Sequence, residues 1–89
     1  MVKVRKVSGQ ELWMAKCPGC GNCHGFDSRW TFNGNVDNPT FFPSFLTWHE
    51  HGDPPQTHRC HSFLTDGHWV YLDDCTHALK GQRVEVPEW

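Results

Sequence analysis

The chain has 89 residues, 37% of them hydrophobic, and a formal net charge of −2 from 8 Lys and Arg against 10 Asp and Glu. A chain this short, taken as one domain over residues 1–89, buries proportionally little apolar surface, so disulfides or a structural metal are expected to stabilise it. The scattered basic residues argue against a nucleic-acid-binding domain, which usually carries a basic patch. No segment resembles a membrane span or a signal peptide, so we expect a cytoplasmic protein.

The first half of the chain predicts short strands separated by turns. Residues 2–7 (VKVRKV) alternate apolar and basic side chains, which is the period of a half-buried strand, and residues 11–16 (ELWMAK) predict a second strand. Residues 29–32 (RWTF) run into Asn-Gly-Asn and predict a strand that ends in a tight turn. Two prolines bracket residues 40–42, which argues against a central strand there, whereas residues 44–50 (SFLTWHE) predict the next strand.

The clearest local prediction is a β-hairpin around the Asp-Gly pair at positions 66–67. Apolar runs flank this pair, which favours a two-residue type I′ turn with Thr65 opposite His68. Alternation along the strand then places Cys60 and His61 on opposite faces.

The chain after the hairpin predicts one helical turn and a last strand. The turn covers residues 75–79, after an acidic start at Asp73 or Asp74, and Gly81 ends it before an edge strand over residues 82–86. The expected fold is therefore mostly β: a small antiparallel sheet with a zinc knuckle and one short helical turn.

The cysteine spacing predicts a structural zinc site. Cys17-Pro-Gly-Cys20 followed by glycine is the sequence of a zinc knuckle, whose two thiolates can share one tetrahedral Zn²⁺. A redox role is less favoured, because such motifs usually have a helix behind them and these residues are poor helix formers. Cys60 and Cys75 flank the open end of the predicted hairpin and complete a four-cysteine site, and Cys23 is left without a metal.

Three histidines leave alternatives to this site open. His24, His61 and His77 each lie within four residues of a predicted ligand, so any of them could replace a cysteine or donate a hydrogen bond to a thiolate. They could also converge as a catalytic metal site, with Asp73 or Asp74 as general base. If residues 75–77 are extended rather than helical, His77 becomes the replacement ligand.

Several motifs together resemble a known family. The segments CPGCGNCHGF, WTFNGNVDNPTFFPS, CHSFLTDG and DCTHALKGQ, with a final VEVP, are similar to small phage and prophage proteins of unknown function. Members are often catalogued as ammonia monooxygenase, a name that does not apply because that enzyme is a membrane copper system. The resemblance covers about residues 14–87 and implies a phage or prophage origin and the cytoplasm of a bacterial host. The family pattern matches this chain at Cys17, Cys20, His24, Cys60, His61, Cys75 and His77.

The sequence leaves two classes of function open. Five tryptophans and six phenylalanines fill the core or form an interaction surface, for which residues 39–45 (PTFFPSF) are the best candidate. We expect a zinc-binding, non-catalytic interaction module that binds a bacterial host or phage protein, for example as an inhibitor of a host factor. The alternative is a small metal-dependent hydrolase that uses His24, His61 and His77. The metal shell discriminates between them, because four protein ligands close a site whereas three ligands and a water permit chemistry.

Overall fold

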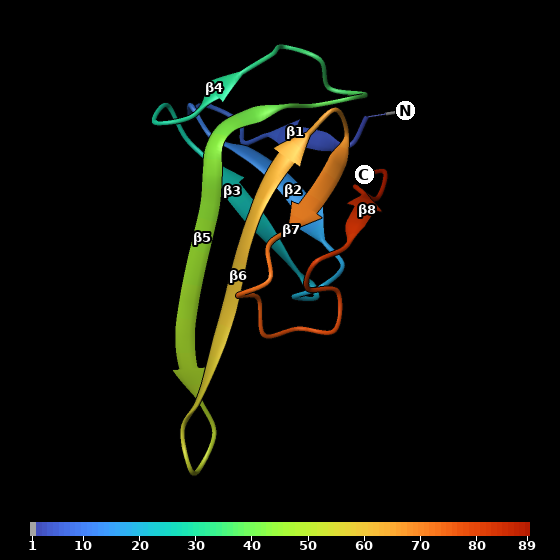
Figure 1. The fold of residues 1–89 in the computed structure, drawn as a ribbon. Helices are drawn as coiled ribbons and strands as arrows, with labels where there is room; N and C mark the ends of the chain where they lie inside the picture. Colours follow the sequence, from blue (N-terminus) through green and yellow to red (C-terminus); the bar gives the residue numbers. More distant parts are fainter. Residues whose placement is uncertain (1) are drawn as a thin grey trace.

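The computed structural model describes residues 2–89, and its regular elements are all β-strands in two antiparallel sheets (Figure 1). The first sheet has the order β1-β2-β3, from β1 (Val4–Lys6), β2 (Trp13–Cys17) and β3 (Asn22–Phe26). The second has the order β4-β5-β6-β7-β8, from β4 (Thr31–Phe32), β5 (Phe41–His51), β6 (Gln56–Thr65), β7 (His68–Tyr71) and β8 (Arg83–Glu85). The predicted mostly-β fold is confirmed.

The segment predicted to be a zinc knuckle is the turn between two paired strands. Residues 18–21 form the turn between β2 and β3, where the amide of Gly21 donates to the Cys17 carbonyl at 2.9 Å. Gly21 has a φ of 73°, which a glycine adopts without strain. The strand β3 that follows was not predicted from the sequence.

The predicted hairpin has the expected register. Thr65 pairs with His68, and Asp66 and Gly67 both have positive φ, as a type I′ turn requires. Burial alternates along β6, with Cys60 buried and His61 partly exposed, so these neighbours do lie on opposite faces. The last strand, β8, forms an edge of the larger sheet, also as predicted.

The helical turn predicted over residues 75–79 is wrong. Residues 73–81 form turns, a bend and irregular backbone without a helix, and one of their backbone hydrogen bonds goes to β6. Leu72 donates to the His61 carbonyl at 2.9 Å and Thr76 to the Arg59 carbonyl at 3.0 Å, so this segment runs beside the strand. Residues 2–89 contain no helix, and hence none of the length and hydrophobicity that a bilayer crossing needs.

Aromatic side chains from both sheets form the core. Phe26 of β3 stacks on Phe41 of β5 with ring centroids 4.4 Å apart, and the buried Trp69 of β7 lies 6.1 Å from Phe26. The prediction that residues 40–42 do not lie in a central strand is wrong at Phe41, which pairs with Phe32 of β4 on one side and with Leu64 of β6 on the other. The register of β5 then shifts between Phe41 and Phe45.

Candidate functional site

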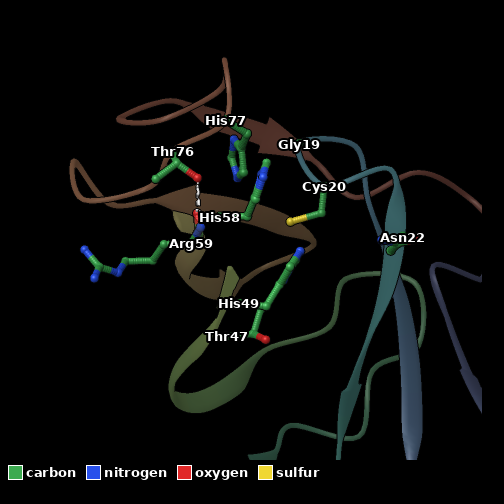
Figure 2. A pocket seen from close by; sticks show the side chains of 9 residues that line it. All are labelled: Gly19, Cys20, Asn22, Thr47, His49, His58, Arg59, Thr76 and His77. Atoms are coloured by element: carbon green, nitrogen blue, oxygen red, sulfur yellow. Dashed lines mark hydrogen bonds between the residues drawn. The ribbon is translucent and has the colours of Figure 1, made fainter. Parts of the chain in front are cut away.

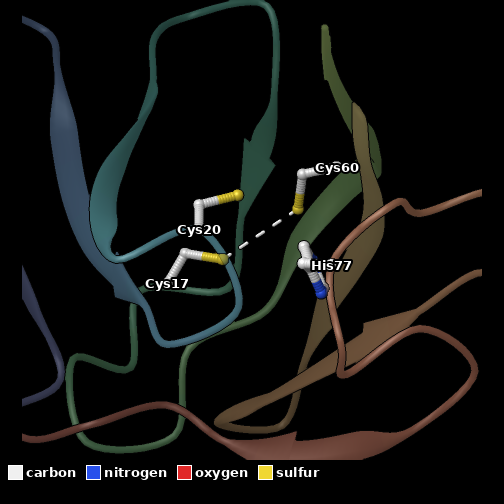
Figure 3. A group of neighbouring side chains, drawn as sticks. All are labelled: Cys17, Cys20, Cys60 and His77. Atoms are coloured by element: carbon white, nitrogen blue, oxygen red, sulfur yellow. Dashed lines mark hydrogen bonds between the residues drawn. The ribbon is translucent and has the colours of Figure 1, made fainter. Parts of the chain in front are cut away.

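Four potential metal ligands from three parts of the chain meet between the sheets (Figure 3). Cys17 ends β2, Cys20 lies in the knuckle, Cys60 lies in β6, and His77 comes from the segment between β7 and β8. One ligand atom from each lies within 4.8 Å of those of the others. The Cys17 and Cys60 sulfurs are 3.9 Å apart, and two sulfurs on a tetrahedral zinc with 2.3 Å bonds would be about 3.8 Å apart. This cluster could hold a metal ion.

Cys75, the fourth predicted ligand, lies outside this cluster. Its buried thiol donates to the His61 carbonyl at 3.1 Å and accepts from the His61 amide at 3.3 Å. The fourth member of the cluster is His77, which was one of the three histidines considered as a replacement ligand.

The pKa values of the three cysteine thiols are compatible with a site that binds a cation. The hydrogen bond from Cys60 lowers the pKa of Cys17 to about 3, and the same bond raises the pKa of Cys60. Burial raises the pKa of Cys20 to about 11. The protein alone therefore accommodates one thiolate at this place, and a bound cation would supply the charge that ionises the other two.

Neighbouring groups orient the cluster. The Tyr71 hydroxyl lies 3.1 Å from the Cys17 sulfur, and a hydrogen bond from His24 also contributes to the lowered pKa of Cys17. A Cβ on Gly19 would lie 2.6 Å from Nε2 of His77, so only glycine lets the knuckle approach this ring.

The His77 ring offers a nitrogen to a metal. Its Nε2 is buried and has no hydrogen-bond partner within residues 2–89, while Nδ1 accepts from the Leu79 amide at 3.2 Å. Metal binding through Nε2 would place the ring proton on Nδ1 and break the contact with Leu79.

One side of the cluster borders a pocket of about 200 Å³ (Figure 2). Cys20 and His77 reach this pocket, and His49 and His58 line it from β5 and β6. The rings of His49 and His58 are stacked 5.2 Å apart in exposed positions. Cys17 and Cys60, in contrast, are buried.

A second constellation surrounds His61, whose side chain leaves β6 on the other face. Nε2 of His61 lies 3.3 Å from the Ser44 hydroxyl on β5, and Nδ1 lies 3.1 Å from a carboxylate oxygen of Asp74. Ser44 and His61 are half-buried and Asp74 is exposed.

The hydrogen-bond chemistry assigns the ring proton of His61. An ionised carboxylate only accepts hydrogen bonds, so the contact with Asp74 requires a proton on Nδ1. In the neutral ring Nε2 is then an acceptor, and the Ser44 hydroxyl donates to it. This arrangement of hydroxyl, imidazole and carboxylate is the arrangement of a serine nucleophile, its base and its orienting acid.

The two constellations share their supporting segments. Cys60 and His61 are consecutive residues of β6 that face opposite sides, and Asp74 and His77 lie three positions apart after β7. Thr76, between them, fastens this segment to β6 by accepting from the Arg59 amide at 2.8 Å. Displacement of the cluster would therefore also move His61 and Asp74.

The three histidines considered as a catalytic metal site do not converge. His24 is buried, stacked on Phe45 at 4.5 Å and edge-on to Trp69, whereas His61 faces Ser44 and His77 joins the cysteines. This geometry does not favour the metal-dependent hydrolase.

Sequence reasoning missed Ser44 and named Asp74 only as one of two candidate bases. Ser-His-Asp triads are recognised by geometry and occur in unrelated chain orders, and the sequence around Ser44 has no motif of a catalytic serine. Cys23 is exposed and belongs to neither constellation.

Fold and site together define an all-β protein with a thiolate–imidazole cluster on one face of β6 and a Ser-His-Asp constellation on the other. The chain belongs to the family described as bacterial ubiquitination-like system serine protease (BubE), whose model matches residues 1–72. The matched residues include Ser44 and His61 and end before Asp74. No curated protein and no solved structure matches the chain. The phage or prophage origin stays a prediction.

Proposed function

We propose that this protein is a serine protease of a bacterial ubiquitination-like system and cleaves the bond between a ubiquitin-like protein and the group attached to it. The observation that carries the proposal is the chain of contacts from Ser44 through His61 to Asp74, at 3.3 and 3.1 Å. The family description independently names a serine protease. The expected setting is the bacterial cytoplasm.

The residues divide the reaction between them. The Ser44 oxygen attacks the carbonyl carbon of the scissile bond while its proton passes to Nε2 of His61. His61 then gives this proton to the leaving amine, and an acyl-enzyme ester on Ser44 remains. A water molecule attacks this ester with His61 again as base, which releases the acid and restores the Ser44 hydroxyl. Asp74 keeps the proton on Nδ1 and stabilises the imidazolium.

The metal in this proposal is Zn²⁺ with a structural role. Cys17, Cys20, Cys60 and His77 would supply four protein ligands, which closes a tetrahedral shell. A bound zinc contributes folding free energy and neutralises the thiolates. The residues that hold it also fix the positions of His61 and Asp74.

A second candidate function is a non-catalytic interaction module, such as an inhibitor of a host factor. One observation favours it: three large apolar side chains, Phe42, Leu46 and Trp48, are exposed on β5. Such a protein would bind its partner without breaking a bond.

Cleavage of a fusion substrate separates these candidates. The substrate is the ubiquitin-like protein of the same system, joined through its C-terminus to a reporter protein. The zinc-loaded wild type should release the reporter, Ser44→Ala should not, and Ser28→Ala is the matched control at an exposed serine outside the site. Equal cleavage by Ser44→Ala, or none by the wild type, would refute the protease.

A further inference from the structure

Exposed apolar side chains gather beside the proposed nucleophile. Within residues 2–89 the exposed large hydrophobic residues are Val2, Phe42, Leu46 and Trp48, at 42%, 64%, 53% and 61% exposure. Three of the four lie on β5, on either side of Ser44. We call Phe42, Leu46 and Trp48 the β5 apolar surface. Several large apolar side chains exposed along one strand are a candidate contact surface.

The strand register places two members of this surface, Leu46 and Trp48, on the face of the sheet that carries the triad. Leu46 pairs directly with His61, and the His61 ring contacts Ser44, so the Leu46 side chain lies on the same face as both. Trp48 is two residues further along the same strand and shares that face. Side chains at alternate positions of a strand are about 7 Å apart, which puts Leu46 about 7 Å and Trp48 about 13 Å along the strand from Ser44.

We propose that the β5 apolar surface binds an extended peptide segment with apolar residues at alternate positions and so presents its carbonyl to Ser44. This inference rests on the proposed protease function. An extended peptide has the same repeat as β5, so about four of its residues cover the distance from Ser44 to Trp48, with alternate side chains meeting Leu46 and Trp48.

The exposure of the side chains around Ser44 favours a single extended peptide segment as the bound partner. Ser44 is half-buried, whereas Phe42 and Leu46 on either side of it are more exposed. The broad surface of a folded domain would rest on these apolar side chains, whereas a single extended chain can bring a carbonyl down to the Ser44 hydroxyl. A flexible tail of the substrate protein fits this description.

Binding can be measured without catalysis in the Ser44→Ala protein loaded with zinc. The probe is a fluorescein-labelled hexapeptide with leucine at alternate positions, and the comparison peptide has serine in place of each leucine. We expect fluorescence anisotropy to show binding of the leucine peptide at least about tenfold tighter than the serine peptide, because apolar side chains leave water on binding. Leu46→Thr and Trp48→Thr, each added to Ser44→Ala, should weaken binding about tenfold. Val2→Thr, an exposed apolar residue away from β5, is the matched control and should leave it unchanged.

Equal affinity for the two peptides, or no loss in both Leu46→Thr and Trp48→Thr at unchanged zinc content, would overturn the proposal. So would a wild-type dimer in light scattering that these substitutions dissociate, because the surface would then join two copies of the chain. Surface-dependent peptide binding by a wild type that cleaves nothing would refute the protease and leave the docking surface standing. Cleavage whose KM is unaffected by Leu46→Thr and Trp48→Thr would refute the docking surface alone.

Discussion

Replacing Cys75 by alanine distinguishes a metal ligand from a residue that positions His61. The Cys75 thiol makes two hydrogen bonds to the backbone of His61, at 3.1 and 3.3 Å, and lies outside the cluster of Cys17, Cys20, Cys60 and His77. Cys75→Ala should therefore keep about one zinc per chain. It should lower the free energy of unfolding by about 1–3 kcal/mol, because a buried hydrogen-bonding partner of the His61 amide is lost.

Cys75→Ala should lower the cleavage activity without lowering the zinc content. The base and the acid of the proposed triad both border Cys75, so Cys75→Ala should slow cleavage, and Cys75→Ser, which keeps both hydrogen bonds, should slow it less. Zinc would be measured by mass spectrometry of the purified protein and stability by urea denaturation. His77→Ala is the control and should lose the metal. Loss of zinc from Cys75→Ala together with its retention in His77→Ala would show that the four-cysteine site is the right one.

Three further predictions concern the metal and the triad. Cys17→Ser should leave the chain largely unfolded in circular dichroism, because a structural zinc supplies roughly 10 kcal/mol or more of folding free energy. Cys23→Ser should leave it folded. Unfolding by Cys23→Ser but not by Cys17→Ser would contradict the ligand set. Asp74→Asn should lower kcat by about 10³–10⁴-fold at unchanged zinc content, because the amide no longer holds the proton on Nδ1 of His61, and an unchanged kcat would remove Asp74 from the mechanism. Apparent zinc affinity, measured by competition with a chromogenic chelator, should fall at least about tenfold for each pH unit between 7.5 and 6. Affinity falls as the pH falls because zinc must displace the protons of two thiols. Burial raises the pKa of Cys20 to about 11, and the pKa of Cys60 is also raised. A zinc affinity that does not depend on pH would contradict this.

Local features of the sequence predicted much of the fold. The Asp-Gly turn and the alternation along β6 specify the hairpin register, because both depend on residues near in sequence. The same alternation separated Cys60 from His61 correctly. The knuckle predicted Cys17 and Cys20 as neighbours for the same reason.

The rest depended on contacts between distant segments. Whether Cys75 or His77 joins the cluster follows from the hydrogen bonds that draw residues 72–76 alongside β6 and prevent a helix. The contact of Ser44 with His61 follows from the pairing of β5 with β6, whose register shifts around Pro43. Neither pairing leaves a pattern in the sequence of one segment.

Labelling with a fluorophosphonate tests the central claim most directly. This reagent phosphonylates an activated serine with loss of fluoride, and its use needs no knowledge of the substrate. The zinc-loaded wild type should gain one adduct, which peptide mapping places on Ser44, and His61→Ala should gain none while it keeps its zinc. An unlabelled wild type, or an adduct that persists in Ser44→Ala, would contradict the assignment of Ser44, His61 and Asp74 as a catalytic triad.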